Sequence, residues 1–327
     1  MASDLSVVIL AAGKGTRMRS PKAKVLHTIG GIPIVAHIIH TVQTLSPERT
    51  VVVVGHQADE VEQTLSARFG KDKLDFALQA QQLGTGHAVM EAQSSWEQGG
   101  ASTLILSGDV PLLQAETLQG LHNHREQHNA AVAVLSFSVD DPTGYGRIVR
   151  DQDGQFLQIR EHRDCSDEQR EIKECNSGIY LVDRDFLKGA LGQLKTDNDQ
   201  NEYYLTDIVE IAMKEGKTVT AHCVDDAGEV LGINDRAQLA ALEQTWQQKR
   251  NEYWMREGCT LRLPQTIQID YDVKLGHNTE ISPNCCLLGN TTIGENCKIG
   301  AGSVLKDTIV KDNMMLPPHS VFTDTKV

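Results

Sequence analysis

The sequence is poor in residues arranged for metal binding or disulfide formation. Its seven cysteines are an odd number, and no two of them form a C-x-x-C pair. The twelve histidines include no H-E-x-x-H motif. His122, His124 and His128 are spaced i, i+2 and i+6, so we interpret them as surface residues that do not share one helix face. This composition favours the reduced thiols of a cytoplasmic protein.

The sequence also lacks features typical of membrane or secreted proteins. It has no run of about 18 apolar residues, so no segment is expected to span a bilayer. Met1 to Asp4 include no basic residue and lead directly into a strand-like run, which is not typical of a secretory signal. The formal net charge of −13 disfavours general nucleic-acid binding, which depends on neutralising phosphates. We therefore expect neither a membrane nor a nucleic acid as a partner.

Acidic residues are missing between Leu5 and Pro47, although the protein as a whole is acidic. This stretch contains five basic residues: Lys14, Arg17, Arg19, Lys22 and Lys24. A short basic segment can be a solvated loop, or it can bind a small polyanion. Charge alone does not distinguish these two possibilities.

The first half of the chain alternates two kinds of hydrophobic pattern. Strand-like runs occur at 5–10, 50–54, 74–79, 103–106 and 131–137, and helical patterns at 33–45, 58–68, 85–96 and 114–127. This alternation predicts βαβ units, and hence an α/β, Rossmann-like fold whose mostly parallel sheet has helices on both faces. Ligands bind such a sheet at the carboxyl ends of its strands.

The remaining segments have other patterns. Residues 140–234 are mixed and suggest an inserted antiparallel part, whereas 235–257 is typical of one long helix. We expect three parts: a nucleotide-binding domain at 1–235, a linker helix at 236–257 and a repeat domain at 258–327.

Apolar residues recur every six positions in the last segment. One track runs through Ile269, Leu275, Ile281, Leu287, Ile293, Ile299 and Leu305. A second track lies two residues earlier, from Ile267 and Val273 through Thr279, Cys285, Thr291, Cys297 and Ser303 to Ile309, Met315 and Val321. A six-residue period predicts a parallel β-helix of about three coils, in which Cys285 and Cys297 are small core residues.

The segment from Leu10 to Met18, L-A-A-G-K-G-T-R-M, directly follows the first predicted strand. A glycine-rich turn in this place can direct backbone N–H groups at phosphate oxygens. It is not a dinucleotide fingerprint, because Met18 occupies the position of the last glycine. It is not a P-loop either, and Gly216-Lys217-Thr218 fails that pattern because Ile211 replaces its first glycine.

The same segment resembles the signature of sugar-1-phosphate nucleotidyltransferases. Further motifs are similar to those of N-acetylglucosamine-1-phosphate uridyltransferases, which pair this domain with a left-handed β-helix. They lie at 79–88, 108–111, 144–148, 161–162, 176–180, 202–207 and 232–236. The resemblance covers essentially the whole chain, and the order and spacing of the motifs make it specific.

The resemblance implies an activity and a set of site residues. The expected reaction joins UTP and N-acetylglucosamine 1-phosphate to give UDP-N-acetylglucosamine and pyrophosphate, with Mg²⁺ as cofactor and a homotrimer as the assembly. Arg17 and Lys24 would be catalytic, and Asp109 and Asn234 would bind the metal. The nucleotide would contact Leu10, Ala11, Ala12, Gly13, Lys24, Gln79, Gly84, Thr85, Ser107, Gly108 and Asp109. The sugar would contact Gly146, Glu161, Asn176 and Asn234.

The sequence departs from this family in two places. Ala23 stands where a proline usually precedes the lysine, so Lys24 is assigned by its register with Val25-Leu26-His27, with Lys22 as the alternative. The β-helix is short, so we do not expect this chain to carry the family's acetyltransferase activity.

The expected chemistry needs no nucleophilic side chain. A phosphate monoester is already an anion near neutral pH, so positioning and charge neutralisation supply the catalysis. Alternatives remain open. The enzyme could use another sugar, such as glucose 1-phosphate, or another base, and the chain could be a non-catalytic subunit of the same fold.

Overall fold

The computed structural model describes residues 4–198 and 200–327. Met1 to Ser3, which entered the expectation about a secretory signal, lie outside the described residues. The chain divides into two compact units. The first contains Met1–Leu26 and Ile34–Gly232, and the second contains His27–Pro33 and Ile233–Val327.

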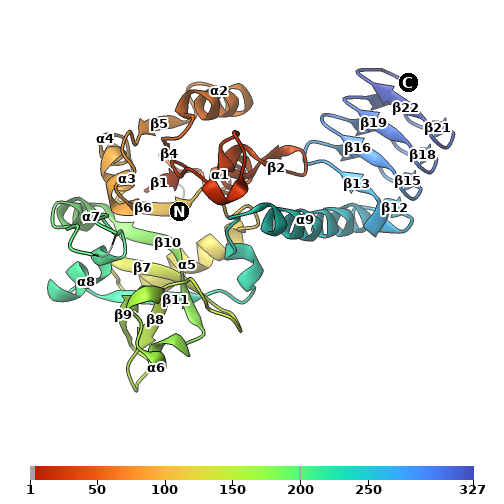
Figure 1. Ribbon diagram of the computed structural model, residues 1–327. Coiled ribbons are helices and arrows are strands. Elements are labelled where there is room, and N and C mark those ends of the chain that lie inside the picture. Colours follow the sequence, from red (N-terminus) through yellow and green to blue (C-terminus); the bar gives the residue numbers. More distant parts are fainter. Residues whose placement is uncertain (1–3, 199) are drawn as a thin grey trace. The chain divides into compact units, whose positions relative to one another are not determined.

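A nine-stranded, mostly parallel sheet forms the centre of the first unit (Figure 1). Its main path runs β11-β7-β10-β6-β1-β4-β5. The strands are β1 (Leu5–Leu10), β4 (Arg49–Val54), β5 (Asp75–Leu78), β6 (Ser102–Ser107), β7 (Val132–Ser138), β10 (Glu174–Asp183) and β11 (Val219–Cys223). Strand β1 pairs in parallel with β4 and β6, whereas β10 is antiparallel to β6 and β7.

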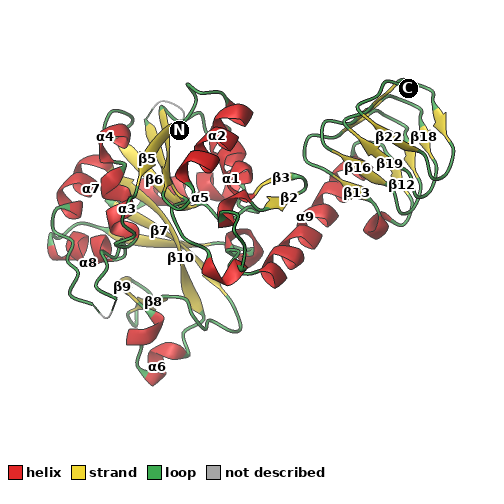
Figure 2. Cartoon of the chain, turned by 45° about the horizontal axis from the view of Figure 1, so that its top comes forward, coloured by secondary structure: helices red, strands yellow, loops and turns green. Residues whose placement is uncertain are grey.

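Helices cover both faces of this sheet (Figure 2). They are α1 (Ile34–Gln43), α2 (Ala58–Phe69), α3 (Thr85–Glu91), α4 (Gln93–Trp96), α5 (Ala115–Gln127), α6 (Asp167–Arg170), α7 (Arg184–Leu191) and α8 (Asp207–Lys214). Successive side chains of a strand point to opposite faces. Accordingly, Val7 joins the core formed with α1, α2 and α5, and Val8 joins the core formed with α3, α4, α7 and α8.

Two local predictions differ from the structure. The helix expected at 85–96 is two helices, α3 and α4, separated at Ala92. The interpretation of the three histidines as surface residues is wrong for His122 and His124, which are half-buried. His124 lies in the last turn of α5 and His128 directly follows that helix, and the ring centroids of His124 and His222 on β11 are 5.2 Å apart. Within the described residues, no group of three or more His, Cys, Asp or Glu could hold a metal ion.

The antiparallel insertion consists of β8 (Arg147–Arg150) and β9 (Phe156–Arg160), which pair with each other, while β8 also pairs with β10. The register between β10 and β7 shifts between Asn176 and Ile179. Gly178 lies within this irregularity at a φ of 78°, a conformation that glycine adopts without strain. The irregularity interrupts the pairing of β10 with β7 directly after Asn176, one of the residues expected to bind the sugar.

The second unit begins with a hairpin that lies far from the rest of the unit in sequence. Strand β2 (Thr28–Ile29) pairs with β3 (Ile32–Pro33) and packs against α9 (Arg236–Arg256). A Cβ atom on Gly30 would lie 2.3 Å from the ring of Trp246, so only glycine fits there. The backbone N–H of Gly30 also donates to Glu243 on α9. The side chain of Asp235 caps α9 by accepting from two backbone N–H groups of its first turn.

The rest of the second unit is a left-handed parallel β-helix built from three sheets. Its strands are β12 (Thr260–Leu261), β13 (Gln268–Ile269), β14 (Lys274–Leu275), β15 (Glu280–Ile281), β16 (Cys286–Leu288), β17 (Thr292–Ile293), β18 (Lys298–Ile299), β19 (Val304–Lys306), β20 (Ile309–Val310), β21 (Met315–Leu316) and β22 (Val321–Thr323). The first apolar track is buried throughout. Cys285 and Cys297 are buried core residues, as predicted.

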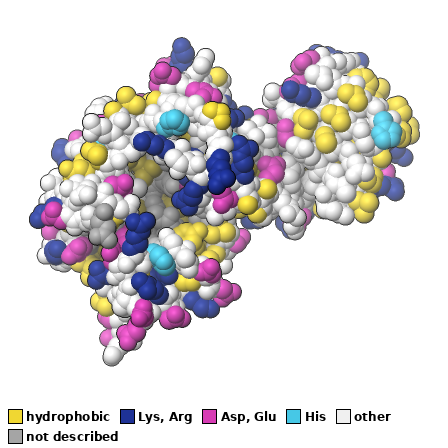
Figure 3. All heavy atoms as spheres, in the orientation of Figure 1, with side chains coloured by type: hydrophobic (Ala, Val, Ile, Leu, Met, Phe, Trp, Pro, Cys, Tyr) yellow, Lys and Arg dark blue, Asp and Glu magenta, His cyan; other side chains and the backbone are white. Residues whose placement is uncertain are grey.

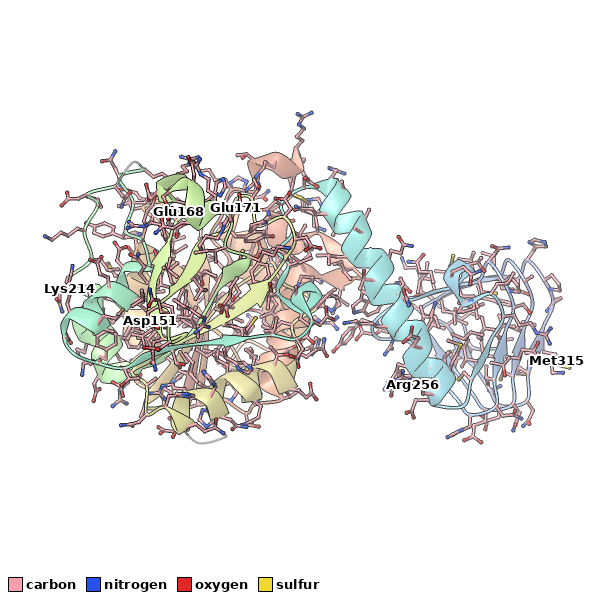
Figure 4. The ribbon with its side chains drawn as sticks, turned by 90° about the horizontal axis from the view of Figure 1, so that it is seen from below. Asp151, Glu168, Glu171, Lys214, Arg256 and Met315 are labelled. Atoms are coloured by element: carbon pink, nitrogen blue, oxygen red, sulfur yellow. The ribbon has the colours of Figure 1, made fainter. Side chains whose placement is uncertain are left out.

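The prediction that the second track faces the core is wrong after Ser303. Ile309 is 41% exposed, and Met315 and Val321 are each 70% exposed. The residue that continues the first track after Leu305 is Val310, five positions later rather than six. This step of five moves every later residue by one position, so Thr308 is buried instead of Ile309. Met315 therefore projects from the outer surface of the β-helix (Figure 4).

Candidate active site

The loops that follow β1 and β6 meet at one edge of the sheet in the first unit. These strands are parallel neighbours, with Leu10 opposite Ser107 at their carboxyl ends. The backbone N–H of Gly108 donates to the carbonyl of Leu10 at 2.8 Å, which ties the two loops together. The parallel pairing therefore places the glycine-rich turn beside the segment Ser107-Gly108-Asp109.

A cavity of about 270 Å³ opens at this edge. Ten of the eleven residues predicted to bind the nucleotide line it: Leu10, Ala11, Ala12, Gly13, Lys24, Gln79, Gly84, Thr85, Ser107 and Asp109. The eleventh, Gly108, lies in the loop between Ser107 and Asp109. Figure 3 shows Lys and Arg side chains around a hollow on one face of this unit. Residues from four separate chain segments are thus brought together at the carboxyl ends of parallel strands.

The glycine-rich turn is shaped by the close approach of Lys24. Gly15 has a φ of 57°, and a Cβ atom there would lie 2.6 Å from the Cβ of Lys24. Any other residue at position 15 would push this lysine away from the cavity. Arg17 follows in the short helix η1 (Thr16–Met18), where it is exposed and is not among the lining residues. Lys22 is also exposed and outside the lining set.

Asp109 makes one ion pair and one hydrogen bond in the cavity, with Lys24 and Ser107. The Lys24 ammonium donates to Oδ2 of Asp109 in a short ion pair, and both side chains are largely buried. The Ser107 hydroxyl donates to Oδ1 of the same carboxylate at 2.6 Å. Buried charges in proteins are paired and hydrogen-bonded in this way. The arrangement offers a cation and a carboxylate side by side to an incoming ligand.

Gln79 forms another part of the wall, just beyond β5. Only 4% of its surface is exposed. Its Nε2 donates to the carbonyl of Gly84 at 2.9 Å and contacts Nδ1 of His87 at 3.1 Å. Gly84 has a φ of 106°, and a Cβ atom there would lie 2.5 Å from the carbonyl oxygen of Tyr203. Glycine is therefore required at this position, next to the start of α3.

The cavity also contains residues that the sequence did not single out. These are Val25, Gln82, Ala88 and Glu202. Gln82, Ala88 and Glu202 lie inside the motifs that carry the family resemblance, so motif membership was the available signal. Glu202 places a second carboxylate in the wall. No local pattern indicated that the loop containing Glu202 reaches this edge of the sheet.

Two of the residues predicted to bind the sugar lie together. The backbone N–H of Asn176 donates to the carbonyl of Gly146 at 2.8 Å. The Nδ2 of Asn176 donates to the hydroxyl of Tyr180 at 2.7 Å. Burial raises the pKa of Tyr180, and the negative charge of Glu161 raises it further.

Glu161 itself lines a different cavity, of about 330 Å³. Acidic residues outnumber basic ones in its lining, where Asp164, Asp197, Asp207 and Glu210 join Glu161, against Arg160 and Lys195. Burial raises the pKa of Glu161, the nearby carboxylates of Asp164 and Asp207 raise it further, and a hydrogen bond with Thr206 acts in the opposite direction. Asn234, the remaining predicted sugar and metal residue, belongs to the second unit.

Comparison with known proteins agrees with this architecture. Residues 7–260 match the model of the MobA-like NTP transferase domain, and residues 272–307 match the bacterial transferase hexapeptide repeats. The chain is 46% identical to the bifunctional protein GlmU of Exiguobacterium sibiricum over 98% of its own length and 70% of that protein. It is 42% identical to GlmU of Enterococcus faecalis over 98% of the chain and 69% of that protein.

A solved structure supports the fold alone. It is described as a glucose-1-phosphate thymidylyltransferase from Bacillus anthracis in complex with sucrose. The TM-score is 0.57 at 20% identity, covering 73% of this chain and 94% of that one.

Proposed function

The chain belongs to the family of bifunctional GlmU proteins, and we propose that its first unit makes UDP-N-acetylglucosamine and pyrophosphate from UTP and N-acetylglucosamine 1-phosphate. One observation supports this most strongly. Ten residues expected to bind the nucleotide, from four chain segments, line a single cavity that also holds the Lys24–Asp109 pair. A nucleoside triphosphate needs such a combination of backbone donors and cationic charge.

The reaction is an in-line displacement at the α-phosphorus of UTP. A phosphate oxygen of the sugar phosphate forms the new bond to that phosphorus. The bond to the bridging oxygen then breaks, and pyrophosphate leaves with the electron pair. No general base is required, because the nucleophile is already an anion near neutral pH. Lys24 stabilises the charge that develops on the phosphates, and Arg17 is proposed to assist from the neighbouring turn.

The family is divalent-metal dependent, and Mg²⁺ is the ion we propose. The residues present fit a hard cation, because the carboxylate of Asp109 lines the cavity and carboxylate oxygens are hard ligands. Mg²⁺ is usually held by one or two protein carboxylates together with substrate phosphates and waters. When bound, the ion supplies positive charge to the triphosphate. Asn234 remains a second ligand predicted from the sequence.

The proposed sugar contacts are Gly146, Glu161 and Asn176. The hydrogen bond from the backbone N–H of Asn176 to the carbonyl of Gly146 supports this proposal for two of them, whereas Glu161 lines the separate acidic cavity. We propose Asn234 as a further sugar contact from its motif. Carboxylate and amide groups suit the hydroxyls and the acetamido group of the sugar.

Release of pyrophosphate from UTP tests this function. The protein is incubated with Mg²⁺ and either N-acetylglucosamine 1-phosphate, glucose 1-phosphate or no sugar. We expect strong release with the N-acetylated sugar only. Equal or better release with glucose 1-phosphate would contradict the substrate, and no release from folded protein would favour a non-catalytic subunit.

A cytoplasmic location and a homotrimer are also proposed. All seven cysteines are free thiols, which suits a reducing compartment. Among the described residues, no helix is long and apolar enough to cross a membrane. The exposed Ile309, Met315 and Val321 of the β-helix support self-association, because exposed apolar patches often mark interfaces. Light scattering of the purified protein tests the trimer.

A further inference from the structure

The orientation of the Gln79 carboxamide is determined by its surroundings. A carbonyl oxygen can only accept a hydrogen bond, so the atom 2.9 Å from the carbonyl of Gly84 must be the amide nitrogen. Among the hydrogen bonds of the described residues, the side chain of Gln79 uses this nitrogen only. Oε1 is then the polar atom that Gln79 can offer to a ligand in the cavity whose wall it forms.

The second hydrogen of the same nitrogen points to His87. Nδ1 of His87 is 3.1 Å away, and it can accept only if it carries a lone pair. In the neutral ring the proton is then on Nε2, which lies 3.0 Å from Oε1 of Glu91. Glu91 is one turn after His87 on α3. A carboxylate accepts this proton, so Glu91 selects the tautomer that Gln79 requires.

The ring of His87 is held by the surrounding backbone. The N–H of Gly86 donates to the carbonyl of Tyr203 at 2.8 Å, and the N–H of Tyr203 donates to the carbonyl of Leu83 at 2.7 Å. The rings of His87 and Tyr203 lie at 24° to each other with centroids 6.3 Å apart. The groups that face His87 are therefore Gln79, Glu91 and Tyr203, and the Gln79–His87–Glu91 chain has one consistent direction of donation.

We propose that His87 and Glu91 are positioning residues that select the base of the nucleotide. They hold Gln79 with its acceptor, Oε1, toward the base. Uracil presents an N3–H donor that matches this acceptor, whereas N3 of cytosine is itself an acceptor and would face Oε1 unpaired. A buried polar atom left without a partner is a strong source of discrimination. Thymine shares N3–H with uracil, so this chain selects against cytosine and not against thymine. The inference rests on the proposed binding of UTP in this cavity.

The test compares kcat/KM for UTP and CTP with the same sugar phosphate. In His87→Leu the acceptor for Gln79 is lost, whereas in His87→Asn the Oδ1 atom replaces Nδ1. Glu91→Ala removes the carboxylate that accepts from Nε2–H of His87 and so selects the tautomer. Glu60→Ala, which removes an exposed carboxylate on α2, is the matched control. Thermal unfolding of each variant checks that it is folded.

We expect the preference for UTP over CTP to fall at least tenfold in His87→Leu and in Glu91→Ala, mainly through KM for UTP. His87→Asn should retain most of the preference, and Glu60→Ala all of it. An unchanged preference in active His87→Leu and Glu91→Ala would overturn the inference while leaving the proposed function standing. An equal loss of the UTP preference in His87→Asn and His87→Leu would also overturn the inference. If the wild-type protein does not use UTP, the proposed function fails and the inference fails with it.

Discussion

Lys24 and Lys22 are two residues apart, yet only Lys24 lines the cavity. Lys24 packs against Gly15 and pairs with Asp109, whereas Lys22 is exposed. We expect Lys24→Met to lower kcat by about 10²–10³-fold, the usual effect of removing one group that stabilises transition-state charge. Lys22→Met is the control and should change kcat by less than about threefold. Steady-state rates of pyrophosphate release provide the comparison, and equal losses in both variants would contradict the assignment.

The charged form of Glu161 lowers the free energy of unfolding, and we attribute this unfavourable placement to its proposed role in binding the sugar. Its pKa is raised, mainly by burial, so its charged form is less favourable in the folded protein than in the unfolded chain. The destabilisation is absent below the unfolded pKa, where both states are protonated, and it grows as the pH rises through the folded pKa.

Glu161→Gln should therefore unfold at a higher temperature than the wild type near pH 7, with the difference disappearing near pH 4. The same variant should raise KM for the sugar phosphate, because a neutral amide replaces a charged acceptor. Thermal unfolding across pH, together with sugar-phosphate kinetics, measures both effects. A variant that is less stable near pH 7 would refute this account of Glu161.

At the scale of elements, α5 and β11 bring imidazoles together. His124 accepts from or donates to the hydroxyl of Thr220 at 2.7 Å and lies between His128 and His222. Burial lowers the pKa of His124, and the two neighbouring imidazoles lower it further. Burial also lowers the pKa of His222, against an opposing effect of Asp225.

A lowered histidine pKa contributes stability that is fully present above the unfolded value, about 6.5, and is lost as the pH falls through the folded value. We predict that the unfolding temperature falls below about pH 6.5, and that His222→Gln makes this fall less steep. Thermal unfolding between pH 5 and pH 8 is the measurement. Identical pH dependence in the two proteins would show that the cluster does not contribute.

The five-residue step after Leu305 can be tested with two variants at neighbouring positions, one buried and one exposed. Val310 is 1% exposed and its neighbour Ile309 is 41% exposed. Val310→Asp should destabilise the second unit by more than about 4 kcal/mol, because it buries an unpaired charge. Ile309→Asp should cost the folding of the unit no more than about 1 kcal/mol, and its separate effect on the proposed trimer is measured by light scattering. Limited proteolysis of the β-helix distinguishes them, and greater sensitivity in Ile309→Asp would contradict the register.

The same two residues show why the sequence prediction was incomplete. Ile309 continues the six-residue period and is apolar, so residue type alone selects it for the core. The structure shows a five-residue step after Leu305, which only the stacking of coils can reveal. By contrast, β1 was predicted with its observed bounds, because a short apolar run before a glycine-rich turn is an unambiguous local signal.

At the scale of the whole molecule, local pattern predicted the order of strands and helices but not their long-range partners. The β2–β3 hairpin belongs to the second unit because Gly30 packs on Trp246 and bonds to Glu243. These contacts join segments more than two hundred residues apart, and no local feature of residues 27–33 indicates them. The cavity was more predictable, since motifs at the ends of parallel strands must meet at one edge of the sheet.

The chain spans roughly 70% of the relatives it matches, and the proposed chemistry takes place in the cavity of the first unit. The central claim is attack by the sugar phosphate on the α-phosphorus of UTP. The most direct test uses N-acetylglucosamine 1-phosphate labelled with ¹⁸O at its three non-bridging oxygens, with mass analysis of both products. The account predicts three labels in the UDP-sugar and none in pyrophosphate. Label in pyrophosphate or in free phosphate would contradict it.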